Sequence, residues 1–294
     1  MSKISEEVRM NFKKVDDIRD EGLTTPDDVV RYDDILYGTD KTWQVMDVYR
    51  PKDKEGEKLP VIVSFHGGGW VYGDKERYQF YCMSLAEQGF AVVNFTYGLA
   101  PDFKFPSQLN DANLVFTWVI DHAGEYGFDT DNVFAVGDSA GAHQLGLYCN
   151  ICTNPEYAKK ANITPPKGFA PRAVALNCGV YRVVVNRENV NLDTALMGEY
   201  LPNGGTDEEI NLVSVADHMT KDFPPTFYMT CTGDFLIAQA PILEEKLLEL
   251  QIDHEFRFVT GEKELGHVFH CNMKSDDAHK LNREECFFFK NHIK

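Results

Sequence analysis

The sequence predicts an α/β fold in which helices cover both faces of a mostly parallel sheet. Short apolar runs typical of buried strands alternate with longer helical patterns along the whole chain, as in parallel strands joined by crossover helices. Two of these runs end in glycine-rich turns, at 66–69 and 137–141. With 294 residues, 43% of them hydrophobic, the chain can bury one large core, so we expect a single domain over residues 1–294.

The expected strands are short and rich in β-branched and aromatic residues: 44–49, 61–65, 91–96, 133–136, 173–177, 226–230 and 255–259. Between them lie the expected helices 76–88, 108–122, 140–153, 237–250 and 276–291. Two segments break the alternation, residues 1 to about 34 and residues 180–222. Insertions at the carboxyl edge of a sheet commonly cover a site, so we expect both segments to form a small cap.

The main chemical signal is Gly137-Asp-Ser-Ala-Gly141, placed between a strand pattern and a helical pattern. Glycines two residues before and two after a serine relieve crowding in a sharp strand-to-helix turn. Such a turn presents Ser139 as a nucleophile and leaves the N–H of Ala140 facing a developing oxyanion. The motif also occurs in ordinary sheet turns, so it needs support from other segments.

Support comes from His66-Gly-Gly-Gly-Trp70, which directly follows the strand pattern 59–65. Three consecutive glycines suit a loop whose N–H groups point at a negative charge with no side chain in the way. We therefore predict an oxyanion hole made by Gly68, Gly69 and Ala140. His66 is expected to brace the loop, because it precedes the serine in the chain.

The remaining catalytic groups are expected after the last two strands. Asp234 follows the strand pattern that ends near residue 230, and His267 lies in the loop after the pattern 255–259. The order serine, aspartate, histidine is the one found in α/β-hydrolase triads. His267 would act as the base on Ser139, and Asp234 would orient the imidazole and stabilise its positive charge.

Other residues compete for these two roles. His270 lies three residues beyond His267, and His267 is preferred because it follows a glycine in the turn itself. The competing acids are Glu262 and Glu264 in the same loop and Asp253 before the last strand. Asp234 is preferred because sites in parallel sheets form at the carboxyl ends of the strands.

From these motifs, the chain over roughly residues 35–294 resembles the α/β-hydrolase fold. Within that fold it resembles the hormone-sensitive-lipase-like esterases and the related carboxylesterases with an H-G-G-x-W signature. Met46-Asp-Val-Tyr-Arg-Pro51 and Thr96-Tyr-Gly-Leu-Ala-Pro101, with Phe105-Pro106 and Asp111, resemble further blocks of that group. The chain departs from the group at Gly98, where arginine is usual, and at Ala142-His143.

The resemblance implies a serine carboxylesterase that works through an acyl-enzyme, with a small-molecule ester as substrate and with neither metal nor cofactor. A short cap and an aromatic mouth favour short acyl groups, acetyl esters and carbohydrate-linked esters included. Trp70, Tyr72 and Asp138 are the expected substrate-binding residues. Three alternatives remain open: an arylformamidase-like amide hydrolase, a feruloyl or sugar-acetyl esterase, and a small-ligand receptor that has lost hydrolysis.

Composition restricts the partners and the location. The net charge of −17 argues against binding to nucleic acid or to an anionic membrane surface, both of which attract basic patches. No apolar run approaches the roughly 18 residues of a membrane span, and the first residues lack the apolar core of a signal peptide. We therefore expect a cytoplasmic protein. The oligomeric state stays open, with a homodimer as one option.

The seven cysteines are an odd number scattered through strand and helix patterns. This distribution indicates reduced thiols that pack as small apolar residues rather than a disulfide framework. Cys149 and Cys152 form a lone C-x-x-C without further ligands at metal-site spacing. Packing is therefore the expected role for this pair.

Overall fold

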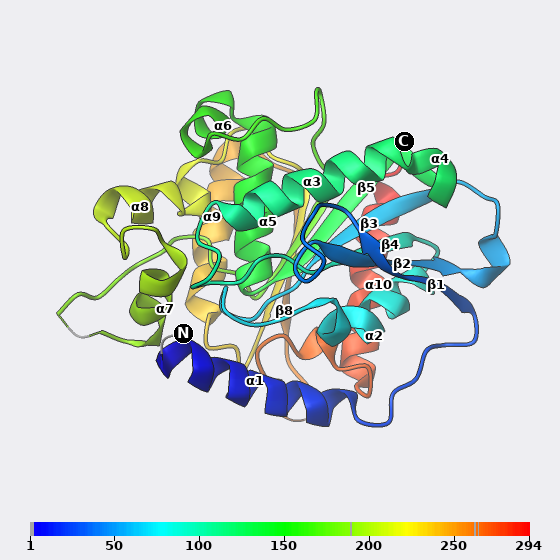
Figure 1. Ribbon diagram of the computed structural model, residues 1–294, viewed down its shortest axis with the longest axis horizontal. Helices are drawn as coiled ribbons and strands as arrows, with labels where there is room; N and C mark the ends of the chain where they lie inside the picture. Colours follow the sequence, from blue (N-terminus) through cyan, green and yellow to red (C-terminus); the bar gives the residue numbers. More distant parts are fainter. Residues whose placement is uncertain (1–2, 189, 262, 264) are drawn as a thin grey trace.

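The computed structural model of the protein describes residues 3–188, 190–261, 263 and 265–294 (Figure 1). Over these residues the strands form one eight-stranded sheet in the order β1-β2-β4-β3-β5-β6-β7-β8. β1 and β2 pair antiparallel, β2 pairs antiparallel with β4, and all later neighbours are parallel. The predicted α/β fold with a mostly parallel sheet is confirmed.

The strands run as follows: β1 Val29–Leu36, β2 Val45–Pro51, β3 Leu59–Phe65, β4 Ala91–Phe95, β5 Phe128–Asp138, β6 Val174–Asn177, β7 Thr226–Cys231 and β8 His254–Val259. The helices are α1 Lys3–Asp20, α2 Lys75–Ala86, α3 Ser107–Asp121, α4 Ala123–Tyr126, α5 Ala140–Thr153, α6 Pro155–Ala161, α7 Leu192–Tyr200, α8 Asp207–Leu212, α9 Ala240–Leu250 and α10 Asp276–Asn291. Short 3₁₀ turns occupy η1 Lys52–Lys54, η2 Val215–Asp217, η3 Ile237–Gln239 and η4 Phe269–Cys271.

Alternate residues of the central strands supply two separate cores. In β3, Val61 and Val63 belong to the core beneath α3, α5 and α9, whereas Ile62 belongs to the core beneath α2 and α10. All three are fully buried, as expected for a parallel sheet covered on both faces. This double coverage explains why the central strands read as continuous apolar runs in the sequence.

Residues 29–36 correct the expectation that the first 34 residues belong to a cap. They form β1, an edge strand that pairs antiparallel with β2. Polar and apolar residues do not alternate regularly in β1, and most of its side chains are partly or fully exposed. The pairing with β2, and not the sequence pattern of β1, therefore stabilises it as a strand. The helices α4 and α6 were also not predicted, because each is too short to show a clear periodicity.

The remaining cap segments lie together along one edge of the molecule. Figure 1 shows the N-terminal end of α1 close to α7, and a hydrogen bond of 3.4 Å joins Ser5 Oγ of α1 to Glu199 Oε2 of α7. Arg9 of α1 donates to the carbonyls of Val71 (2.7 Å) and Ala100 (3.0 Å). The helix α1 is therefore bound both to the other cap segment and to the chain that follows the triple glycine.

None of the helices in the described ranges combines the length and the apolarity needed to cross a bilayer. The cytoplasmic location expected from the sequence stays a prediction.

A buried carboxyl group joins α10 to the sheet and to α2. Glu285 is 1% exposed, and its two oxygens accept hydrogen bonds from Tyr81 Oη (2.9 Å) and Asn177 Nδ2 (2.6 Å). Burial raises the pKa of Glu285 from 4.5 to about 7, against the lowering effect of these two hydrogen bonds. A carboxyl group that is easier to protonate when folded couples stability to pH.

We expect Glu285→Gln to become more stable relative to the native chain as pH rises from about 4.5 to 7. In this window the folded native chain binds more protons than the unfolded chain, so the contribution of Glu285 to stability falls with rising pH. The change in the stability difference should be on the order of 1 to 3 kcal/mol. Urea unfolding at a series of pH values measures it.

The exposed Glu245 on α9 provides the control, because Glu245→Gln should show no comparable pH dependence. A stability difference for Glu285→Gln that stays constant across this window would contradict the assignment.

Candidate active site

Ser139 lies at the turn between β5 and α5, in a conformation that non-glycine residues rarely adopt. Its φ is 53° and its ψ is −119°. Hydrogen bonds hold the turn on both sides: Ser139 N donates to Asn177 O of β6 (2.9 Å), and His143 N donates to Ser139 O (3.1 Å). Such a strained strand-to-helix turn is the geometry of a nucleophile elbow.

The two glycines around Ser139 are required by close backbone contacts. A Cβ on Gly137 would lie 2.7 Å from the carbonyl carbon of Gly141. A Cβ on Gly141 would lie 2.1 Å from the carbonyl oxygen of Phe65 and 2.6 Å from that of His66. The first turn of α5 therefore packs directly on the backbone where β3 enters the triple-glycine loop.

The triple-glycine loop folds into a tight turn beside this elbow. Gly68 and Gly69 have φ values of 113° and 60°, in the left-handed region that glycine adopts without strain. The carbonyl of Gly68 accepts from the N–H groups of Val71 (3.3 Å) and Tyr72 (3.0 Å), so the turn is closed on itself. Ala140 is the first residue of α5, a position whose N–H has no partner within its own helix.

His66 is placed to brace this loop. Its ring is fully buried and stacks on Tyr97 at 3.9 Å, with Nδ1 2.8 Å from the carbonyl oxygen of Gly67. Burial lowers the pKa of His66 to about 4, so the ring is neutral near pH 7. A neutral, enclosed imidazole supports the loop and cannot reach solvent or substrate as a base.

Asp234 and His267 are brought together by the last two strands. Asp234 follows β7, His267 follows β8, and a parallel bridge between Gly233 and Gly266 extends the sheet to both loops. His267 Nδ1 lies 2.6 Å from Asp234 Oδ1. The opposite ring nitrogen, Nε2, is buried and has no hydrogen-bond partner among the described residues.

The carboxylate of Asp234 is held ionised by its neighbours. Burial opposes ionisation, but hydrogen bonds from His267, Thr230 Oγ1 (2.6 Å) and Leu236 N (2.9 Å) outweigh it and lower the pKa of Asp234 to about 2. Asp234 therefore stays negative at any pH at which an imidazole titrates. This is the electrostatic arrangement that stabilises an imidazolium.

Backbone hydrogen bonds across the sheet connect the turn at Ser139 to the strands that precede Asp234 and His267. Ser139 N bonds to Asn177, and the next residue, Cys178, bonds through its N–H to Met229 O of β7 (2.8 Å). Ligand-type atoms of Cys178, Asp234 and His267 all lie within 4.8 Å of one another. The carboxyl ends of β5 to β8 thus gather the serine, the acid and the base at one edge of the sheet.

A cavity of about 250 Å³ opens beside these groups. Its lining includes Trp70, which follows the triple glycine, and Leu236, whose N–H donates to Asp234, but not Ser139 or His267. The rest of the lining comes mainly from the cap: Val180, Arg182, Val183, Val184, Asn186, Asn191, Asp193 and Met197, together with Gln239. The cavity is smaller than the roughly 300–1,000 Å³ of sites for drug-sized ligands.

The predicted substrate-binding residues differ in their positions. Trp70 lines the cavity, but Tyr72 and Asp138 are not among its lining residues. Tyr72 Oη donates to Asp16 Oδ2 of α1 (2.9 Å), and Asp138 is buried beneath the elbow, where it accepts from Tyr78 Oη (2.7 Å). No ligand contact tests the roles expected of these two residues, so both stay predictions. Tyr72 joins the loop to α1, and Asp138 belongs to an internal polar cluster.

The competing acids and bases lie elsewhere. The exposed Asp253 pairs with His292 Nε2 (3.1 Å), and His270 is fully buried with its ring edge-on to Tyr81. Glu262 and Glu264 lie outside the described residues. Among the histidines in the described part of the chain, it is His267 that forms a hydrogen bond with Asp234.

A chain of side-chain hydrogen bonds that we did not predict joins the loop, the elbow helix and the cap. Trp70 Nε1 donates to His143 Nδ1 (3.1 Å), and His143 Nε2 lies 2.7 Å from the carbonyl oxygen of Val213. Because Nδ1 accepts, Nε2 carries the proton and donates to Val213. Nothing in the sequence indicates this role of His143, because its two partners lie 73 and 70 residues away along the chain.

The family model BD-FAE matches residues 46–247 of the chain. Among curated proteins, the versiconal hemiacetal acetate esterase of Dothistroma septosporum is 28% identical over 215 residues, which cover 69% of this chain and 64% of that protein. Esterase LipC of Mycobacterium tuberculosis is 31% identical over 124 residues, which cover 42% of this chain and 30% of that protein. The chain thus spans less than two thirds of the length of these relatives.

Among solved structures, an inhibited esterase B from Lactobacillus rhamnosis superposes with a TM-score of 0.88. The match covers 99% of this chain and 97% of that chain, at 23% sequence identity. This similarity shows that the two proteins share the α/β-hydrolase fold.

We expect Gly141→Ala to reduce turnover of a short p-nitrophenyl ester by about 100-fold, because the added methyl group would push α5 away from the carbonyls of Phe65 and His66. Stability should fall by about 1 to 3 kcal/mol. Steady-state kinetics and thermal unfolding measure the two effects.

Gly124→Ala is the matched control, since a Cβ there meets no atom within 4 Å. Native-like turnover in Gly141→Ala would show that contact between the elbow and the loop does not set the geometry of the site.

Proposed function

Since the chain belongs to the BD-FAE family and has the α/β-hydrolase fold, we propose that it is a serine carboxylesterase for short-chain acyl esters. The observation that carries this proposal is the 2.6 Å contact between His267 Nδ1 and Asp234 Oδ1 at the sheet edge that also holds the strained Ser139. The names of the curated relatives, an acetate esterase and esterase LipC, support the same class of reaction.

In the proposed mechanism, His267 Nε2 takes the proton of Ser139 Oγ as the oxygen attacks the ester carbonyl. The N–H groups of Gly68, Gly69 and Ala140 stabilise the negative oxygen of the tetrahedral intermediate. His267 then gives its proton to the departing alcohol. A water molecule, deprotonated by the same nitrogen, hydrolyses the acyl-enzyme and releases the acid.

Each supporting residue has a defined part in this reaction. Asp234 stays ionised through the cycle, since its pKa is about 2, and it stabilises the imidazolium of His267. Its own position depends on the hydrogen bonds from Thr230 and Leu236. The triad and the donors require no metal or cofactor for these steps.

The cavity beside Trp70 supports the choice of short acyl groups. At about 250 Å³ it has room for a small group only, and its apolar lining includes Trp70, Val183 and Met197. We propose that residues 1–294 act as one catalytic domain, with α1 and residues 180–222 as its cap. In support, every described strand joins one sheet, and the cap contributes most of the cavity lining.

We expect Ser139→Ala to lower kcat/KM for p-nitrophenyl acetate by at least about 10⁴-fold, because no other residue supplies the attacking oxygen. Mass spectrometry should show one equivalent of an organophosphate on the native chain and none on the variant. Ser107→Ala, at the start of α3, is the matched control and should behave like the native chain.

Native-like hydrolysis by Ser139→Ala would disprove the nucleophile. A native chain that binds esters without turning them over and resists the organophosphate would instead be a receptor. Preferred turnover of N-formylkynurenine over the ester would show an amide hydrolase, and preferred turnover of feruloylated or acetylated oligosaccharides would narrow the ester class.

We expect kcat/KM to be highest for acetyl to butyryl esters and to fall at least about 10-fold for decanoyl esters, because longer chains exceed the cavity. Met197→Ala should move the optimum to longer chains by removing volume from the cavity wall. Met10→Ala, exposed on α1, is the control. A panel of p-nitrophenyl esters tests this, and an optimum that is unchanged in Met197→Ala would place the acyl group elsewhere.

A further inference from the structure

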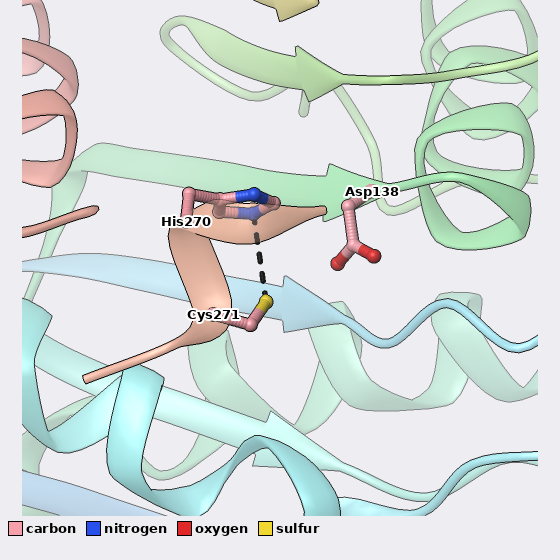
Figure 2. A group of neighbouring side chains, drawn as sticks. All are labelled: Asp138, His270 and Cys271. Atoms are coloured by element: carbon pink, nitrogen blue, oxygen red, sulfur yellow. Dashed lines mark hydrogen bonds between the residues drawn. The ribbon is translucent and has the colours of Figure 1, made fainter. Parts of the chain in front are cut away.

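Three ligand-type side chains converge in the interior behind the elbow, away from the reacting groups. Asp138 lies at the end of β5, and His270 and Cys271 lie on the 3₁₀ turn η4 (Figure 2). All three are buried, with 2%, 1% and 2% of their surface exposed. One carboxylate oxygen, one ring nitrogen and the thiol sulfur lie within 4.8 Å of one another.

One separation in this group matches that of a tetrahedral metal site. His270 Nε2 and Cys271 Sγ are 3.6 Å apart. Zinc with bond lengths of about 2.0 Å to nitrogen and about 2.3 Å to sulfur separates two tetrahedral ligands by about 3.5 Å. The carboxylate of Asp138 lies within 4.8 Å of both atoms, and it would move closer to supply a third ligand. We propose that Asp138, His270 and Cys271 form a binding site for a zinc ion.

The ring nitrogens of His270 are poorly satisfied within the described ranges. Nε2 lies 3.6 Å from the thiol of Cys271, a weak hydrogen-bond partner that a zinc ion would replace. A fully buried imidazole normally has oxygen or nitrogen partners. Zinc on Nε2 would leave Nδ1 as it is, buried and without a hydrogen-bond partner among the described residues.

Asp138 and Cys271 are both buried, and neither is in an ion pair with a cationic side chain among the described residues. The positive charge of Arg19 in α1 has a longer-range electrostatic effect on Asp138 and Cys271. Its guanidinium, however, is paired with Asp16 (2.9 Å) and Asp20 (2.7 Å). A divalent cation would neutralise a carboxylate and a thiolate together, which offsets the cost of burying their charges.

The position of the cluster connects it to three segments of the catalytic centre. Asp138 precedes Ser139, and His270 lies three residues after His267. Tyr78 Oη donates to Asp138 Oδ2 (2.7 Å) and accepts from Gly67 N (2.8 Å). A water molecule would supply the fourth ligand. A bound ion would therefore cross-link the elbow, the triple-glycine loop and the loop of the base.

The test is metal retention by the full chain. After treatment with a chelator, the protein is mixed with zinc chloride, desalted and analysed by inductively coupled plasma mass spectrometry. The native chain should retain about one zinc per molecule. Cys271→Ser and His270→Gln should each retain at least about 10-fold less zinc than the native chain. Circular dichroism shows whether each variant is folded.

Cys178→Ser is the control variant, because Cys178, Asp234 and His267 form the other group of ligand-type atoms found in the described residues. It should retain zinc like the native chain. Loss of zinc from Cys178→Ser, with retention in Cys271→Ser, would move the site to the catalytic pair and overturn the proposal. A native chain that retains no zinc would overturn it as well.

X-ray absorption of the zinc-loaded native chain tests the ligand set without any variant. One sulfur at about 2.3 Å and nitrogen or oxygen ligands at about 2.0 Å are expected, and they should be unchanged in Cys178→Ser. Cobalt in place of zinc should show a thiolate charge-transfer band in the near ultraviolet. A shell of oxygen and nitrogen alone would exclude Cys271 as a ligand and overturn the proposal.

Discussion

The whole site depends on one close contact between backbones, where the first turn of α5 packs on the end of β3. With no side chain at Gly141, the carbonyls of Phe65 and His66 approach the elbow to a distance that a single methyl group would prevent. This contact fixes the serine and the triple-glycine loop relative to each other, although they lie more than sixty residues apart in the sequence. The proposed oxyanion donors would therefore be positioned by the fold before any ligand binds, which is the condition for electrostatic preorganisation.

The sheet places the remaining groups by its strand order. β5, β6, β7 and β8 are consecutive neighbours and all run parallel, so the loops that carry the serine, the acid and the base leave from the same edge. The bridge between Gly233 and Gly266 continues this register beyond the strands and sets the distance between Asp234 and His267. Thr230, which holds the carboxylate of Asp234, comes from β7 itself, so the pair is anchored to a strand of the sheet.

The sequence alone predicts the central part of this fold, and it predicts Ser139, Asp234 and His267 at the ends of strands, because both leave local signals. Strands buried on two faces read as apolar runs, and β3, β4 and β7 begin and end within about two residues of the expected positions. The edge strand β1 leaves no such signal, because it is stabilised by its pairing with β2 and keeps polar side chains. Roles that depend on contacts between distant segments also leave no signal in the sequence. Tyr72 reaches α1 and Asp138 turns inward to Tyr78, and neither partner can be deduced from spacing along the chain.

The hydrogen-bond chain from Trp70 through His143 to Val213 also restricts how this sequence can diverge. His143 accepts on one nitrogen and donates on the other, so a substitution at this position leaves both an indole N–H and a main-chain carbonyl without partners in a dry interior. A change at Trp70 alone would compensate for only one of these two lost hydrogen bonds, and a change around Val213 alone would compensate for only the other. Homologues that carry another residue at position 143 should therefore differ at the tryptophan and in the cap at the same time, and the three segments should be inherited as a set.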